Sequence, residues 1–174
     1  NFRGVVRARA IATEACRAAS NGAEFIGRVK DEAGLDLEIV SQETEAKLAV
    51  SGCANLIDPH AEGAIVFDIG GGSSEIAWLE LGRKNRCCPL EAQRRIRAWT
   101  SLPLGVVTLA ERHGGINVTL DTFEDMVADV TVLLEKFEAQ HNIRCLLKQR
   151  RAHLLGTSGT VTTIAGVFLR LPRY

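Results

Sequence analysis

The stretch FDIGGGSSE, residues 67–75, places three consecutive glycines between an apolar run and two serines followed by a glutamate. Apolar runs of strand length, GAIVFDI and EIAWLEL, lie on either side, so the pattern predicts a β-hairpin. A hairpin turn that only needs flexibility requires one or two glycines, and a third adds a cost in backbone entropy. Amides without side chains in the way can converge on an anion. We therefore interpret the turn as a phosphate-binding loop made by Gly70, Gly71, Gly72 and Ser73.

The turn does not fit three other glycine motifs. The phosphate loop of nucleoside triphosphatases needs a lysine after its last glycine, and neither GGGSSE nor GTSGTVT contains one. A dinucleotide-binding fingerprint opens a helix, whereas the residues after Gly72 read as a strand. The serine elbow of hydrolases needs glycines two residues to either side, and GTSGT at residues 156–160 is one residue too short.

The chain alternates between the two hydrophobic periodicities, which predicts a mixed α/β fold. Strands are expected at residues 6–13 and 35–41, with helices after the first strand, at 22–34 and at 43–57, and the pair Asn21-Gly22 as a stop signal. Residues 83–99 read as a basic, exposed excursion between strand-like runs, the second of which is TSLPLGVVTLAE. Apolar residues at helical spacing predict a helix over 120–137.

A second glycine turn follows an apolar run near the end of the chain. AHLLGTSGTVTTIAGVFL, residues 152–169, predicts a strand, a turn and an apolar helix. The turn consists of Gly156, Thr157, Ser158, Gly159 and Thr160.

Composition excludes several classes of function. The 174 residues carry 21 basic and 21 acidic side chains, and this balance argues against a dedicated nucleic-acid or anionic-membrane surface. We find no apolar run long enough to span a bilayer and no signal peptide. Five cysteines without a C-x-x-C pair indicate neither a disulfide frame nor a zinc site, and suit a reducing cytoplasm. The missing initial methionine suggests that the functional unit is larger.

Two carboxylates flank the first glycine turn. Asp68 beside phosphate-binding amides would repel the substrate unless a cation bridged them, so we expect Mg²⁺ held through water; a turn-capping role is the alternative. For Glu75 the residues alone favour an ordinary salt-bridged or exposed strand residue over a functional one.

Five segments, in order, resemble the exopolyphosphatase and guanosine pentaphosphate phosphohydrolase (Ppx/GppA) family. FDIGGGSSEIAW resembles its second phosphate loop, D-I-G-G-G-S-[TS]-E. The other four similar segments are AIATEACRAASN (10–21), IVSQETEAKLAVSG (39–52), SLPLGVVTLAE (101–111) and LLGTSGTVTTIA (154–165).

The resemblance implies an actin-like, ribonuclease-H-like fold of two lobes, as in Hsp70 and sugar kinases, of which only part is present. Residues 1–57 would be the C-terminal part of the first lobe and 58–174 the N-terminal part of the second, with substrate in the cleft between lobes. The family's first phosphate loop, a D-L-G-S-N-S-type hairpin, is absent from this sequence. The resemblance therefore implies a phosphate cradle that is half built, and a chain that is inactive by itself.

The resemblance also assigns roles to residues. Glu45 matches the general base, Arg17 a phosphate-contacting arginine, and Asp68 the acidic residue near magnesium. Glu75 matches a further carboxylate of the loop, and Gly156 to Thr160 match the turn that faces the adenosine side in nucleotide-binding relatives. The chain departs from the E-E-A motif, because Thr44 stands for its first glutamate and Gln42 for the usual glycine.

The implied function is hydrolysis of the terminal phosphoanhydride of inorganic polyphosphate or guanosine pentaphosphate, in the cytoplasm and in a homodimer when full length. Arginines within residues 83–97 and 144–151 could hold a long polyanion by charge, although a solvated surface is the simpler interpretation. Two alternatives stay open: a non-catalytic module that senses phosphorylated ligands, and a phosphotransferase, for which we find no aspartate base or acceptor pocket.

Overall fold

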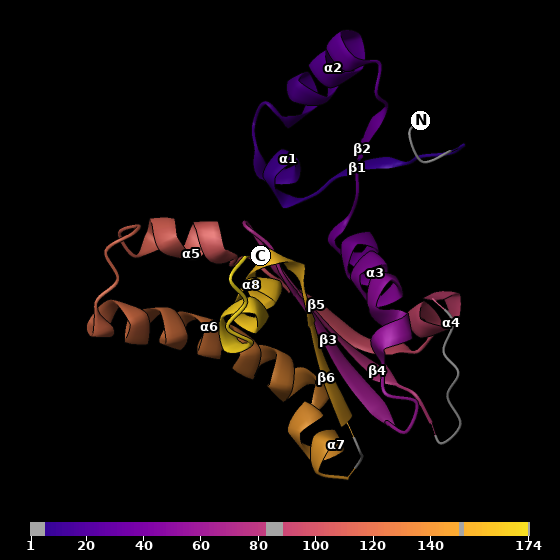
Figure 1. Ribbon diagram of the computed structural model, residues 1–174, viewed down its shortest axis with the longest axis vertical. Helices are drawn as coiled ribbons and strands as arrows, with labels where there is room; N and C mark the ends of the chain where they lie inside the picture. The colour runs from indigo at the N-terminus through magenta and orange to yellow at the C-terminus, as the bar shows by residue number, and fades with distance from the viewer. Residues whose placement is uncertain (1–5, 83–88, 150–151, 174) are drawn as a thin grey trace. The chain divides into compact units, whose positions relative to one another are not determined.

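A computed structural model describes residues 6–82, 89–149 and 152–173 (Figure 1). The chain divides into two compact units, residues 1–45 and 46–174, and each is described by itself. The predicted lobe boundary after residue 57 stays a prediction. None of the helices in the described ranges combines the length and apolar character needed to cross a lipid bilayer.

The first unit is a small α/β layer. Its strands β1 (Ala10–Ala12) and β2 (Leu37–Ile39) pair in parallel, and the helices α1 (Glu14–Ala18) and α2 (Gly22–Ala33) connect them. The predicted end of α2 is confirmed, because Gly34 takes the left-handed conformation, φ 66°, that suits glycine after a helix. α1 ends at Ala18, three residues before the predicted stop at Asn21-Gly22, and the predicted start of the next helix at Gly22 is confirmed.

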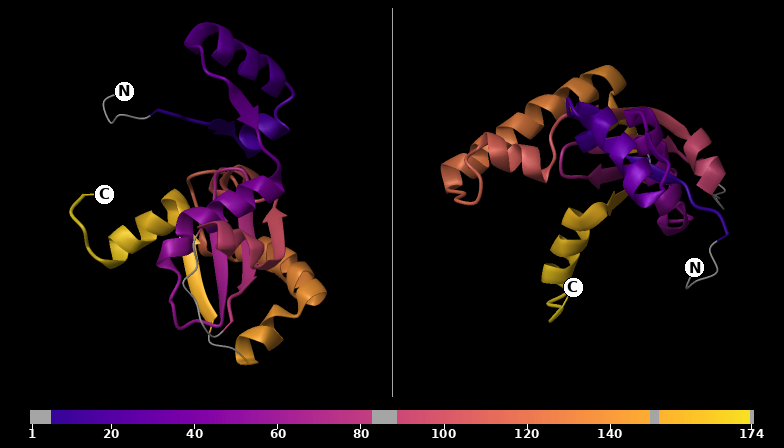
Figure 2. Two further views of the ribbon diagram at one scale, coloured as in Figure 1. Left: turned by 90° about the vertical axis from the view of Figure 1, so that its right-hand side faces the viewer. Right: turned by 90° about the horizontal axis from the view of Figure 1, so that it is seen from above.

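The helix α3 (Gln42–Cys53) begins in the first unit and continues into the second. Ser41 caps its start, with its Oγ accepting from the amide of Thr44 at 3.2 Å. The second unit then runs through a further set of elements (Figures 1 and 2). These are η1 (Ala54–Leu56), β3 (Gly63–Ile69), β4 (Ser74–Glu80), α4 (Pro89–Arg94), β5 (Ile96–Leu102), α5 (Val106–Arg112), α6 (Leu120–His141), α7 (Ile143–Gln149), β6 (Ala152–Thr157) and α8 (Ser158–Phe168).

The sheet of the second unit has the strand order β5-β4-β3-β6. The predicted hairpin is confirmed: β3 and β4 are antiparallel, with Ile69 opposite Ser74. β6 pairs in parallel with β3, and Thr157 lies beside Asp68. Because the carboxyl ends of parallel neighbours meet at one edge, the two glycine turns come to the same edge of the sheet.

Both faces of this sheet are covered. One face carries a buried cluster that includes Val50 of α3, Val66 of β3 and Leu79 of β4. The other face packs Trp78 of β4 against Phe137 of α6. Alternate residues of each strand therefore go into separate cores, as the two-residue repeat of a strand requires.

The segment predicted as an exposed excursion, 83–99, is partly wrong. Residues 83–88, which include Cys87 and Cys88, lie outside the described residues. Ala92 of α4 is fully buried in the core, and β5 already begins at Ile96. The strand-like reading of TSLPLGVVTLAE is also only half right, because β5 ends at Leu102 and Val106 begins α5.

Candidate active site

The two glycine turns of the sequence line one cavity. Its volume is about 560 Å³, and it lies wholly within the second unit. Gly70 and Gly71 contribute from the first turn, and Ser158, Gly159 and Thr160 from the second. The parallel pairing of β3 with β6 thus joins two turns that are about 90 residues apart in sequence.

The glycines of the first turn do not adopt the left-handed backbone conformation for which glycine is often required. Gly70, Gly71 and Gly72 are absent from the glycines with left-handed φ. The Gly70 amide donates to the carbonyl oxygen of Ser73 at 3.0 Å and closes the hairpin. Small size is therefore the property that matters here, because it leaves the backbone of the turn open to a close neighbour.

That neighbour is the first turn of α5, whose amides donate hydrogen bonds to carbonyl oxygens of the glycine turn. The amide of Val106 donates to the Gly70 oxygen at 3.0 Å, and the amides of Val107 and Thr108 donate to the Gly71 oxygen at 2.9 and 3.2 Å. In a trans peptide the C=O and N–H bonds point in opposite directions, and no described peptide is cis. The amides of Gly71 and Gly72 therefore point away from α5.

These two amides are available as donors. Within the described part of the chain neither donates a hydrogen bond. The peptide groups that carry them are polarised by the bonds from α5, which strengthens an N–H as a donor. Ser73 is only 2% exposed, and its hydroxyl group has no hydrogen-bond partner among the described residues. A buried hydroxyl without a partner is uncommon in a folded chain and suits a ligand group.

The start of α8 supplies a second set of donors. The first amides of a helix have no acceptor inside it, and Thr157 makes no side-chain cap bond to them. Ser158 has a φ of 78°, a left-handed conformation that is strained for a residue other than glycine. Strain of this kind concentrates at functional turns, and a helix N-terminus favours anions.

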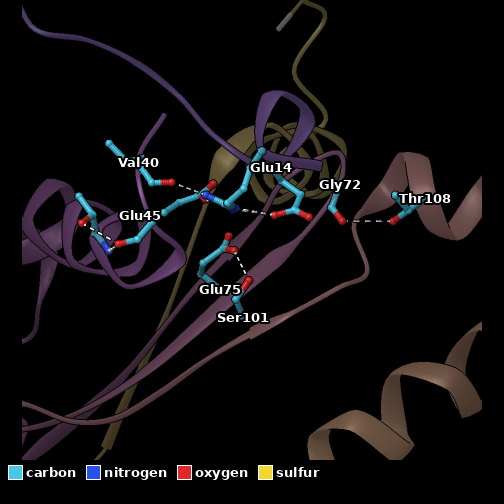
Figure 3. Close-up of polar contacts among 10 residues, drawn as sticks. Glu14, Val40, Glu45, Gly72, Glu75, Ser101 and Thr108 are labelled. Atoms are coloured by element: carbon cyan, nitrogen blue, oxygen red, sulfur yellow. Dashed lines mark hydrogen bonds and ion pairs between the residues drawn. The ribbon is translucent and has the colours of Figure 1, made fainter. Parts of the chain in front are cut away.

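Two carboxylates lie side by side below the first turn. Asp68 and Glu75 are directly opposite on β3 and β4, so their side chains share one face of the sheet. Glu75 is only 3% exposed and accepts a hydrogen bond from Ser101 Oγ at 2.7 Å (Figure 3). The Asp68 carboxylate makes no hydrogen bond or ion pair with the described side chains, whereas the Asp68 backbone is paired within the sheet.

This pair fits a divalent cation. Adjacent like charges repel, and Mg²⁺ commonly takes one or two carboxylates while phosphate oxygens and water complete its shell. The described residues contain no group of three or more histidine, cysteine, aspartate or glutamate side chains that could hold a metal ion.

The remaining two predicted site residues meet in the first unit. Arg17 Nη2 donates to Glu45 Oε2 at 2.9 Å and to Glu14 Oε2 at 2.6 Å, and Nη1 donates to the Val40 oxygen at 2.5 Å (Figure 3). Burial by itself lowers the pKa of Arg17, but the hydrogen bonds to Glu45 and Glu14 outweigh it, and the pKa lies above its ordinary value. The guanidinium that was expected to contact phosphate is thus surrounded by acceptors from its own unit.

Three of these residues were not singled out from the sequence. Glu14 could have been found from its spacing of three to Arg17 on a helix. Ser101 and Thr108 gave no local signal, because their partners Glu75 and Gly72 lie 26 and 36 residues away. Gly156, in contrast, was singled out, and the nearest atoms to a side chain there would be those of the Phe67 ring. Its position suits close packing rather than contact with a ligand.

Comparison with known proteins places the chain in a family. A profile of the Ppx/GppA phosphatase family matches residues 2–168. The PPX-GPPA enzyme of Aquifex aeolicus has a similar structure, with 30% identity and a TM-score of 0.66 over 99% of this chain and 50% of that one. An exopolyphosphatase from Cytophaga hutchinsonii is 25% identical, with a TM-score of 0.69 over 99% of this chain and 51% of that one.

The chain therefore spans about half the length of these solved structures. An exopolyphosphatase-like protein gives a TM-score of 0.73 at 26% identity, over 94% of this chain and 47% of that one. These likenesses confirm the predicted α/β, actin-like fold class, and the profile confirms the predicted resemblance. The chain belongs to the Ppx/GppA phosphatase family.

Proposed function

We propose that this chain is part of a phosphoanhydride hydrolase that releases the terminal phosphate of inorganic polyphosphate or guanosine pentaphosphate. The observation that carries the proposal is the cavity lined by both glycine turns. The unused amides of Gly71 and Gly72, and those at the start of α8, can neutralise phosphate oxygens. The chain belongs to a family of phosphatases, which supports hydrolysis over a purely structural role.

In the proposed reaction, water attacks the terminal phosphorus and the bond to the bridging oxygen breaks. Phosphoryl transfer needs little covalent chemistry from the protein beyond positioning and charge neutralisation. Glu45 would take the proton of the attacking water, and Arg17, which already contacts Glu45, would hold that carboxylate in place. Mg²⁺ near Asp68, when bound, would offset the charge of the phosphate oxygens.

A non-catalytic sensor of phosphorylated ligands is the second candidate. The observation that favours it is the occupied guanidinium of Arg17, which has carboxylate partners in place of phosphate. A sensor would bind phosphate through the turns without turning substrate over. The homodimer and the cytoplasmic location are further parts of the proposal that rest on the resemblance alone.

Release of phosphate from polyphosphate by the intact protein tests the hydrolase. Glu45→Gln should lower the rate about a hundredfold or more, because a general base is removed while its shape is kept. Glu43→Gln, an exposed position on the same helical turn, is the matched control and should keep the rate of the unmodified protein. Binding without release by the unmodified protein would favour the sensor, and equal rates in both variants would exclude Glu45 as the base.

A further inference from the structure

The glycine turn is held by α5, and the contact is too close to be incidental. Gly105, directly before α5, approaches the backbone of Gly70 and Gly71 so tightly that a Cβ at residue 105 would collide with their carbonyl groups. The conflicting atoms are backbone atoms, so no side-chain rotation could relieve the clash. A glycine is therefore required at residue 105 for α5 to reach the turn.

Thr108 links this glycine to the turn through its hydroxyl group. Its Oγ1 accepts from the Gly105 amide at 2.8 Å and lies 3.2 Å from the Gly105 oxygen. The same Oγ1 lies 3.5 Å from the Gly72 oxygen (Figure 3). The Thr108 amide also donates to the Gly71 oxygen. One residue thus fixes both the start of the helix and the position of the turn beside it.

The other end of α5 is fastened to α6. Arg112 Nη1 contacts Asp129 Oδ2 at 2.9 Å, and His113 Nε2 lies 3.1 Å from the same oxygen. A helix of seven residues makes few internal hydrogen bonds and depends on such contacts for its position. Asp129 therefore restrains the helix whose first turn orients the glycine amides.

We propose that Gly105, Thr108 and Asp129 are positioning residues: α5, anchored at both ends, orients the amide of Gly71, which lines the cavity, and the neighbouring amide of Gly72 for phosphate. This inference rests on the proposed function, because phosphate as the ligand of the glycine turn is taken from it. None of the three residues needs to touch the substrate, because they act through the peptide groups of the turn. The positioning matters for affinity, since donors that are already oriented lose less freedom when phosphate binds.

The test follows the amide NMR signals of Gly71 and Gly72 in the chain while inorganic phosphate is added. Thr108→Val keeps the shape and removes the hydroxyl, and should weaken phosphate binding roughly tenfold, about the effect of one hydrogen bond. Thr108→Ser should restore it. Thr131→Val is the matched control, because the Thr131 hydroxyl bonds to the Val127 oxygen on α6, away from the turn.

A purely structural role would lower the melting temperature without changing the phosphate affinity of the folded protein. Unchanged affinity in Thr108→Val, or an equal loss in Thr131→Val, would therefore overturn the inference. If the unmodified chain shows no response to phosphate, the proposed function fails instead. In that case hydrogen exchange at the Val106, Val107 and Thr108 amides decides: faster exchange in Thr108→Val alone supports anchoring of the turn, and unchanged exchange refutes it.

Discussion

The guanidinium of Arg17 is shared by the carboxylates of Glu14 and Glu45 and the carbonyl oxygen of Val40. The Arg17 guanidinium therefore already has hydrogen-bond acceptors when no substrate is bound. A phosphate that approached Arg17 would have to compete with two carboxylates of the same unit. Glu14 has no role in the proposed reaction, so its carboxylate mainly competes with phosphate for Arg17.

We expect Glu14→Gln to strengthen phosphate binding by the intact protein about two- to fivefold, because a neutral amide competes less strongly for a guanidinium than a carboxylate does. Isothermal titration with inorganic phosphate measures this change. Glu24→Gln, on the exposed side of α2, is the control and should leave binding unaltered. Weaker binding in Glu14→Gln would show instead that Glu14 is needed to orient Arg17.

Ser101 supports the buried carboxylate of Glu75, and its loss should be visible in stability. Ser101→Ala removes a hydrogen bond to a side chain that is 3% exposed, which should cost about 1–2 kcal/mol in the free energy of unfolding. Urea denaturation measures the cost. In a Glu75→Gln background the same substitution should matter less, and an undiminished effect there would mean that Ser101 acts through other contacts.

For single residues, the sequence could identify the glycines and the acidic residues beside them, but not the residues that hold them in place. The Asp68 and Glu75 carboxylates are adjacent because Ile69 pairs with Ser74, a register that the turn itself determines. Glu45 and Arg17 had no local signal beyond their resemblance to a family motif. Ser101 acquires its role only from the pairing of β4 with β5, which no nearby residue encodes.

Among the elements, those with strong periodicity were the ones that sequence could predict. The 22 residues of α6 and the two strands of the hairpin follow the expected repeats. α5 was missed because GVVTLAE contains adjacent valines, which favour strands. Its first amides are satisfied by carbonyls of the glycine turn about 35 residues earlier, so a tertiary contact decides its conformation.

The anchor of α5 on α6 should make stability depend on pH in the acid range. Hydrogen bonds from Arg112 and then His113 hold the pKa of Asp129 below its ordinary value. A carboxyl group with a lowered pKa in the folded state stabilises the protein above its unfolded pKa, and this stabilisation is lost as the pH falls through the folded pKa. The contribution of Asp129 should therefore fade below about pH 4.

Denaturation midpoints of the unmodified chain and of Asp129→Asn, followed between pH 2 and pH 7, test this expectation. The unmodified chain should be the more stable of the two at neutral pH, and the difference should shrink as Asp129 becomes protonated. Asp125→Asn, an exposed position one helical turn earlier, should show no such trend. A difference that stays constant down to the lowest pH would mean that the Asp129 carboxylate does not anchor α5 through its charge.

For the molecule as a whole, the division into units separates binding from the proposed proton transfer. Both glycine turns, their cavity and α5 belong to residues 46–174, whereas Arg17 and Glu45 belong to residues 1–45. A unit of 45 residues lies near the lower limit for independent folding, while the larger unit has a four-stranded sheet with a core on each face.

We therefore expect residues 46–174, expressed alone, to fold and to bind inorganic phosphate at the Gly71 and Gly72 amides, but to release none from polyphosphate. Circular dichroism reports folding, and amide NMR titration reports binding. The same fragment with Thr108→Val is the matched control and should bind more weakly at equal helix content. A folded fragment that ignores phosphate while the intact chain binds it would show that the turns cannot form the site without the first 45 residues, and that binding and proton transfer are not divided between the units.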